Sequence, residues 1–302
     1  MRNDIARPAS LGRYRLGEGP VWDADRERVL WIDVSRGTVF SGTLDGRSVI
    51  ENSAVHVDET VGAVAVSASG DLLVAGRHDL HVVDRAGRSR RVLMVVQPDK
   101  ASRLNDGGCD PAGRFVVGSL RQDDRVSDEC LYRWDQDAVT VLDDDLTLSN
   151  GLAWSADGTA MYSVDTIPGV IWSRPYDSVT GACGPRTEFL RCDDGKPDGL
   201  CLDVDGNIWV AMWGAGQVRC YRPDGAQIAV VDVPAPHTSS VAFVGPHRDL
   251  LLITTARDEL SEAQLEEFPD SGRLFIADVG VRGLPTHPWR PHPSGTTSEW
   301  TL

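Results

Sequence analysis

A repeated unit of roughly 45 residues constrains this 302-residue chain more than any other feature of its sequence. Each unit has an apolar stretch, a turn and a second apolar stretch. The turns are Asp25-Arg26, Ser69-Gly70, Ala112-Gly113, Asp157-Gly158, Asp205-Gly206 and His247-Arg248. The stretches that follow them read VLWID, LLVAG, RFVVG, AMYSVD, NIWVA and LLLITT. Short runs rich in Val, Ile, Leu and Trp between turn residues predict strands joined in hairpins.

Further strand candidates complete each unit to about four strands, which is typical of the blades of a propeller. We therefore predict an all-β fold, a six-bladed β-propeller with four-stranded antiparallel blades around a central channel. The chain is expected to form a single domain over residues 1–302, with repeats that start near residues 17, 61, 105, 149, 197 and 238.

Three segments fall outside the repeat. Residues 11–16 are predicted to supply a strand that closes the ring. The segment from Ser261 to Phe268, which Pro269 follows, is predicted to form a short helix inserted in the sixth blade. The Pro-rich tail over residues 287–302 is expected to be loosely ordered.

The formal net charge of −15 argues against nucleic acid or an anionic membrane surface as a partner, because both attract basic patches. No apolar run is long enough to span a membrane, and the N-terminus lacks the apolar core of a secretory signal. The six cysteines show no zinc-binding or redox spacing. We expect reduced thiols and a cytoplasmic location. The sequence leaves the oligomeric state open.

One position of the repeat carries a side-chain oxygen in four of the six units. It lies just before the innermost strand and is occupied by Glu18, Gly62, Asn105, Asn150, Asp198 and Ser239 in chain order. Equivalent starts of inner strands meet at one mouth of the channel. Two carboxylates and two amide oxygens there favour a hard divalent cation such as Ca²⁺, Mg²⁺ or Mn²⁺, while Zn²⁺ and Fe²⁺ stay open. Glu-Gly, Asn-Gly and Asp-Gly pairs are also common turn formers, but their recurrence at one repeat position favours a shared site.

The loops after the second strands are expected at the same mouth. In the third unit this loop contains Asp123, and Arg103 precedes the innermost strand on the same side. Asp33 and Asp165 end the second strands of units 1 and 4, where a structural hydrogen bond is the favoured role. Trp213 ends the second strand of unit 5, where packing at the blade edge and contact with a substrate are equally favoured.

Four segments, in order and at propeller spacing, resemble motifs of the gluconolactonase/regucalcin (senescence marker protein) family. They are LGEGPVW at 16–22, RLNDG at 103–107, LSNGLAW at 148–154 and PDGLC at 197–201. The similarity continues through TARD at 255–258 and GRLF at 272–275, and so covers nearly the whole chain. Each motif alone is weak, whereas the ordered set is specific.

The resemblance implies a six-bladed propeller with one catalytic divalent cation, held by Glu18, Asn150 and Asp198. It also implies that Arg103 and Asn105 contact the substrate. The family's substrate-binding acid maps onto Asp123. Here the chain reads Arg-Gln-Asp-Asp rather than a pair of glutamates, which puts the substrate preference in doubt.

The expected function is metal-dependent hydrolysis of sugar lactones to aldonic acids, of gluconolactonase or pentonolactonase type, in carbohydrate metabolism. Such an enzyme is a hydrolase acting on carboxylic ester bonds, with a small sugar lactone as its partner. Ca²⁺ is the first expectation for the cation, with Zn²⁺, Mn²⁺, Mg²⁺ and Fe²⁺ as alternatives. Asp198 is expected to activate the attacking water. Two alternatives stay open: an organophosphate hydrolase on the same site, and a calcium-binding propeller without enzymatic activity.

Overall fold

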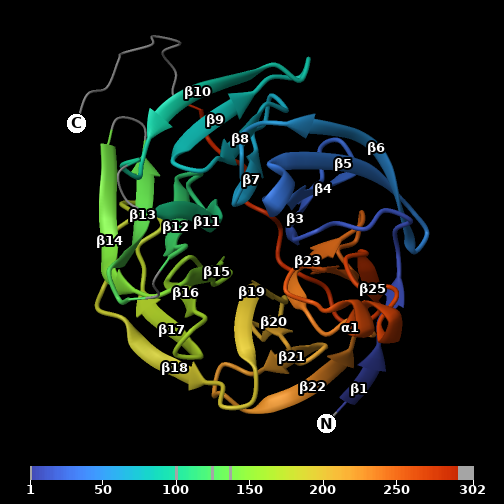
Figure 1. Ribbon diagram of the computed structural model, residues 1–302. Coiled ribbons are helices and arrows are strands. Elements are labelled where there is room, and N and C mark those ends of the chain that lie inside the picture. The colour runs from blue at the N-terminus through green and yellow to red at the C-terminus, as the bar shows by residue number, and fades with distance from the viewer. Residues whose placement is uncertain (1, 99–100, 124–125, 136–137, 292–302) are drawn as a thin grey trace.

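Six sheets stand around a central channel in the computed structural model, which confirms the predicted six-bladed β-propeller (Figure 1). The structure describes residues 2–98, 101–123, 126–135 and 138–291. Successive blades follow one another along the chain, so each blade packs against the blades that precede and follow it. The inner strands begin at residues 17, 63, 102, 149, 196 and 238, close to the predicted repeat starts.

The strands are described most simply by their distance from the channel. The inner strands of blades 1 to 6 are β3 (Gly17–Asp23), β7 (Ala63–Val66), β11 (Ser102–Cys109), β15 (Ser149–Trp154), β19 (Lys196–Leu202) and β23 (Thr238–Val244). The second strands are β4 (Arg28–Asp33), β8 (Leu72–Ala75), β12 (Phe115–Arg121), β16 (Ala160–Asp165), β20 (Ile208–Trp213) and β24 (Leu250–Thr255). The third strands are β5 (Thr38–Asp45), β9 (Asp79–Val83), β13 (Glu129–Asp135), β17 (Val170–Pro175), β21 (Gln217–Tyr221) and β25 (Phe275–Ala277). The outer strands are β6 (Ser48–His56), β10 (Ser89–Met94), β14 (Ala138–Leu146), β18 (Thr187–Arg191), β22 (Gln227–Asp232) and, in blade 6, β2 (Arg7–Pro8).

The N-terminal segment closes the ring, but not with the residues that the sequence predicts. The closing strand is β2, which pairs with β25, and β1 (Arg2–Ile5) adds a fifth strand in parallel to β22 of blade 5. The prediction of a strand over residues 11–16 is wrong: only Leu16 forms an isolated bridge there, with Ala256. The side chain of Leu11 is 88% exposed and does not pack in the blade. Pro8 can stand in the closing strand because an outermost strand needs backbone partners on one side only.

The predicted helix in blade 6 is confirmed as α1 (Glu262–Glu267). Ser261 caps it: its hydroxyl accepts from the backbone N–H of Gln264, whose side chain accepts from the Ser261 N–H. The helix ends at Glu267, and its C-cap residue Phe268 directly precedes Pro269. No helix in the described part of the chain has the length and apolar character needed to cross a membrane.

The C-terminal segment over residues 278–291 leaves blade 6 and crosses the end of the channel where the inner strands finish. Leu284 donates a backbone hydrogen bond to Leu202 of blade 5, and Arg290 donates one to Gly113 of blade 3. Trp289 is buried and stacks on Trp134 of blade 3. The tail predicted to be loose is therefore packed over residues 287–291, and residues 292–302 lie outside the described residues.

Candidate functional site

Five of the six inner strands carry a register irregularity near their first residues. The shifts fall between Glu18 and Val21, Leu104 and Gly107, Asn150 and Leu152, Pro197 and Leu200, and Thr238 and Ser240. A bulge bends its strand and re-aims side chains away from the regular ladder. The four oxygen-bearing positions that the sequence singled out all lie at these irregularities, at the end of the channel opposite the C-terminal segment.

A continuous chain of hydrogen bonds joins the polar side chains of blades 3 and 4. Arg103 donates to Asn105 Oδ1 at 2.7 Å, and Asn105 Nδ2 donates to Asn150 Oδ1 at 2.7 Å. Asn150 Nδ2 donates to Thr166 Oγ1 at 2.8 Å. All four side chains are buried. The structure thus brings together Asn105 and Asn150, which share the repeat position, and Arg103, which precedes Asn105 by two residues.

Three carboxylates at the channel wall act on one another electrostatically. Burial, and then the charge of Asp106, raises the pKa of Glu18 from its ordinary value of 4.5 to about 8, although Gly19 N–H and Arg103 oppose the shift. Burial, and then the charges of Glu18 and Asp106, raises the pKa of Asp198 well above its ordinary value. Repulsion between ionised carboxylates of this kind is relieved by a bound cation or by protons.

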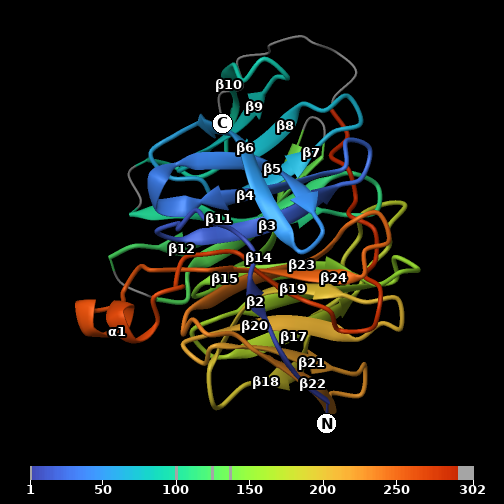
Figure 2. The same cartoon turned by 90° about the vertical axis from the view of Figure 1, so that its right-hand side faces the viewer.

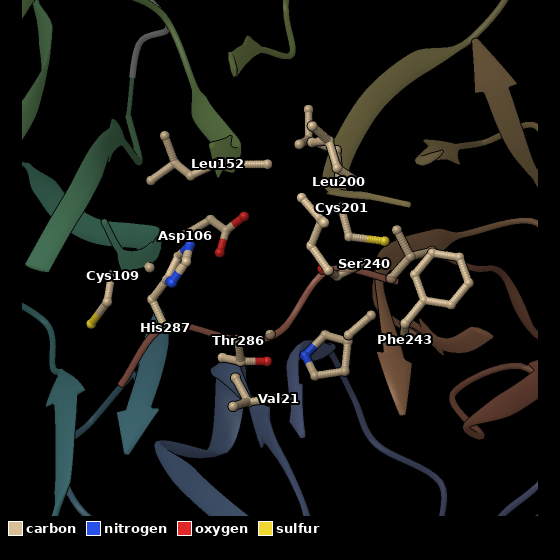
Figure 3. A pocket seen from close by; sticks show the side chains of 18 of the residues that line it. Val21, Asp106, Cys109, Leu152, Leu200, Cys201, Ser240, Phe243, Thr286 and His287 are labelled. Carbon is tan, nitrogen blue, oxygen red and sulfur yellow. The ribbon is translucent and has the colours of Figure 1, made fainter. Parts of the chain in front are cut away.

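Asp106 is the member of this group that the sequence analysis missed. Burial raises its pKa to about 6, against the opposing N–H groups of Gly107 and Gly151. Asp106 lines a cavity of about 170 Å³ in the channel below the cluster, together with His287 of the C-terminal segment (Figure 3). The available signal was its position directly after Asn105, at a bulge where consecutive residues can both face the channel.

Blades 2 and 6 depart from the oxygen-bearing pattern for structural reasons. A Cβ on Gly62 would lie 2.4 Å from the backbone oxygen of Asn105, so this position tolerates only glycine. Ser239 donates to the backbone oxygen of Gly17 at 2.6 Å, which joins blade 6 to blade 1. These two positions therefore hold the inner strands of neighbouring blades together instead of contributing to the cluster.

The acids that follow the second strands separate into two kinds. Asp33 accepts from the N–H groups of Arg15 and Leu16, and Asp165 accepts from those of Thr147 and Leu148, so both hold the loops that enter the inner strands. These are the structural hydrogen bonds that the sequence favours. The Asp123 carboxylate lies instead at the rim, 56% exposed and paired with Arg121.

The donor chemistry of the cluster fits a hard divalent cation. Asp198 Oδ1 is buried and has no hydrogen-bond partner among the described residues. All the candidate donors are oxygens, the ligands that Ca²⁺ and Mg²⁺ prefer. In the described residues no group of three or more His, Cys, Asp or Glu side chains is placed to hold a metal. The set of Glu18, Asn150 and Asp198 differs from such a group because one of its three members, Asn150, is an amide.

Comparisons with known proteins identify the family and agree with the fold. Residues 16–257 match the model of the SMP-30/gluconolactonase/LRE-like region. Regucalcin of Gallus gallus is 32% identical over 288 residues, which are 92% of this chain and 95% of that protein. Pentonolactonase XacC of Haloferax volcanii is 34% identical over 281 residues, 90% of this chain and 93% of that protein. The crystal structure of a calcium-binding protein, regucalcin, from Agrobacterium tumefaciens superimposes with a TM-score of 0.87 at 28% identity, and covers 96% of this chain and 100% of that one.

Proposed function

The chain belongs to the SMP-30/gluconolactonase/LRE-like family, and from that membership we propose that it hydrolyses sugar lactones to aldonic acids with the help of a divalent cation. It is a hydrolase that acts on ester bonds. The metal dependence and the role of each residue are the parts that the proposal adds.

One observation carries the proposal: a set of oxygen donors at one channel mouth contains a buried carboxylate oxygen, Asp198 Oδ1, without a partner in the described residues. Burial and the charge of Asp106 disfavour the ionised form of Glu18, and burial and the charges of Glu18 and Asp106 disfavour that of Asp198, so both acids favour a nearby counter-charge. A packing role for these acids would not require an unpartnered oxygen.

Glu18, Asn150 and Asp198 are the residues that would hold the cation, with Ca²⁺ as the first expectation for an all-oxygen set. When bound, the cation supplies Lewis-acid polarisation of the lactone carbonyl. A regucalcin with the same fold is described as a calcium-binding protein, in agreement with this choice.

The side chains supply the remaining chemistry. Asp198 accepts the proton of the attacking water while the water oxygen bonds to the carbonyl carbon. The bond between that carbon and the ring oxygen breaks, and the proton passes to the ring oxygen, which becomes a hydroxyl of the aldonic acid. Arg103 and Asn105 orient the sugar hydroxyls from blade 3, and Asp123 accepts from a hydroxyl at the rim.

We expect the enzyme to work in the cytoplasm on a small molecule. All six cysteines are free thiols in the structure, which suits a reducing compartment.

The test is a proton-release assay on metal-stripped protein with five- and six-membered aldonolactones, and with each divalent ion returned separately. Turnover above spontaneous hydrolysis should depend on the added ion and should be lost in Glu18→Gln. Glu59→Gln is the matched control, because Glu59 is 72% exposed and pairs with Arg77 at the surface. Lactone turnover that is indifferent to metal removal and to Glu18→Gln would overturn the proposal.

A further inference from the structure

A groove of about 690 Å³ opens on the ligand-bearing face, beside the cluster of oxygen donors. Its lining comes from loops of blades 4, 5 and 6 and includes Thr166, Ile167, Asp193, Lys196, Trp213 and His237. The volume lies within the ~300–1,000 Å³ range of small-molecule pockets, whereas the channel cavity of about 170 Å³ is smaller than that range. Of these two hollows, only the groove has room for an organic ligand.

The groove lies next to the candidate metal ligands, and residues of its lining contact them or stand beside them in the same strand. Thr166 lines the groove, accepts from Asn150 Nδ2 at 2.8 Å and donates to the backbone oxygen of Pro197 at 2.8 Å. Lys196, at the start of β19, lies two positions before Asp198 in the same strand and also lines the groove. A molecule whose reacting group sits at the cluster can therefore extend into the groove without leaving the protein surface.

An aromatic pair forms one wall of the groove. The rings of Trp213 and His237 stack with centroids 4.1 Å apart and planes 14° apart. His237 Nδ1 lies 2.9 Å from the backbone oxygen of Asp258, which fixes the ring in place. Trp213 is half-buried, and the neighbouring Ile167 and Pro168 are exposed at the rim. Such a surface suits the C–H face of a sugar ring, with polar groups around it to fix orientation.

The charges around the groove select against anions. The lining carries the exposed carboxylates of Asp193 and Glu259 and one lysine, Lys196, and Asp194 is already paired with Arg219 at 2.7 Å. A sulfonate, phosphate or carboxylate placed there meets more negative than positive charge. The carboxylates are, however, good acceptors for the hydroxyls of a neutral sugar.

We propose that the groove binds a second, neutral sugar unit attached to the lactone ring, so that the substrates of this enzyme include the aldonolactones of disaccharides. The second sugar packs on Trp213, while the reacting ring stays at the oxygen cluster. This inference rests on the proposed lactonase function and adds a substrate class to it.

The experiment compares kcat/KM for glucono-1,5-lactone with kcat/KM for cellobiono- and maltobiono-1,5-lactone, which share the reacting ring. Trp213→Ala should lower the value for at least one disaccharide lactone about tenfold, equivalent to about 1.4 kcal/mol, and leave glucono-1,5-lactone within about twofold. Trp213→Phe retains an aromatic face and should restore most of the loss. Trp172→Ala is the matched control. Trp172, on β17, is also half-buried, but its ring lies under the guanidinium of Arg186 and outside the groove.

A second measurement separates this inference from the lactonase proposal. Binding of cellobiose and maltose to the Glu18→Gln protein can be measured by calorimetry without turnover. At least one of the two sugars should bind more weakly when Trp213→Ala is added to that variant. If the wild-type protein turned over no lactone with any added ion while disaccharide binding still depended on Trp213, the lactonase proposal would fail and the groove would stand as a sugar site. Lactone turnover with equal effects of Trp213→Ala on all three lactones, or with none, overturns the groove proposal alone.

Discussion

The two ends of the channel are built from the same inner strands and yet have opposite characters. At the end where these strands begin, carboxylates and amides meet and a groove stays open beside them. At the end where they finish, the C-terminal segment crosses the channel and Trp289 packs into an apolar cluster. Figure 2 shows the ring from the side, with α1 projecting from one face and the red C-terminal segment running along the other. One end is organised for chemistry and the other for closure.

This difference indicates that residues at one end of the channel serve mainly function and residues at the other end mainly stability. The bulges at the strand starts place polar side chains where they repel one another, a strain that buried apolar packing elsewhere offsets. The closed base removes one route for solvent into the channel. The following variants test whether the two ends are as independent as the structure indicates.

The largest effect is expected from Asp198→Asn at the open end. Loss of the proposed base should lower kcat by ~10²–10⁴-fold. The metal-free variant should nevertheless unfold at a higher temperature than the wild type, because one of three mutually repelling carboxylates has gone. Lactone assays and thermal unfolding measure the two effects. Unchanged kcat with the metal still bound would contradict the base assignment.

Trp289→Ala tests the closed end. Removal of a buried aromatic side chain should lower the free energy of unfolding by about 3 kcal/mol. Since the substitution lies at the opposite end from the cluster, kcat measured below the unfolding temperature should change less than about twofold. Urea unfolding and lactone turnover decide the outcome. A large loss of kcat in folded protein would show that the two ends are coupled.

The stability of the metal-free protein should fall as the pH rises. The pKa of Glu18 is raised to about 8 and that of Asp106 to about 6, so the folded state holds protons more tightly than the unfolded chain. Stability from these groups is therefore full below their ordinary pKa values of 4.5 and 3.8 and is lost as the pH rises through the raised values.

Melting temperatures between about pH 5 and pH 9, with and without Ca²⁺, measure this dependence. The stabilisation by Ca²⁺ should grow with pH, because the ligands must lose their protons to bind it. Glu18→Gln should flatten the profile of the metal-free protein. A melting temperature that rises across this range in metal-free wild type would argue against the buried carboxylates as its cause.

The smallest effect is expected from Asp123→Ala at the rim. This carboxylate is 56% exposed, so the hydrogen bond to a sugar hydroxyl that we propose for it competes with water. KM for a monosaccharide lactone should rise by about threefold with kcat unchanged, as for other exposed polar contacts. Asp224→Ala, at a carboxylate that is 63% exposed in the blade 5 turn, is the control. A large fall in kcat would place Asp123 closer to the reaction than its exposure indicates.

Most of the fold could be predicted from the sequence repeat, because every blade needs the same hairpin and the same apolar second strand. The turns at residues 69–70 and 157–158 could be recognised for this reason. The closing strand could not: Arg7–Pro8 has two residues, no apolar alternation and a partner, β25, at the far end of the chain. The path of residues 278–291 across the channel was equally hidden, since it depends on single contacts such as that of Trp289 with Trp134.

The site was predictable where one residue per repeat decides its position, as for Asn105 and Asn150. It was not predictable at Asp106, because the repeat alignment considers one residue in each unit and the bulge exposes two to the channel. The requirement for glycine at position 62 depends on the backbone oxygen of Asn105, which no local pattern reveals. The features of the site that the repeat does not predict thus depend on contacts between blades.

The ring closure also has a consequence for the order in which the protein is made. Arg2 donates to the backbone oxygen of Val279, 277 residues further along the chain. Bringing two segments so far apart in the chain together has an entropic free-energy cost on the order of 5 kcal/mol. During synthesis Arg7 and Pro8 therefore stay unpaired until residues 275–276, their partners in β25, have been made. During that interval the segment that forms β2 has no strand partner, and a chaperone or a second nascent chain can reach it.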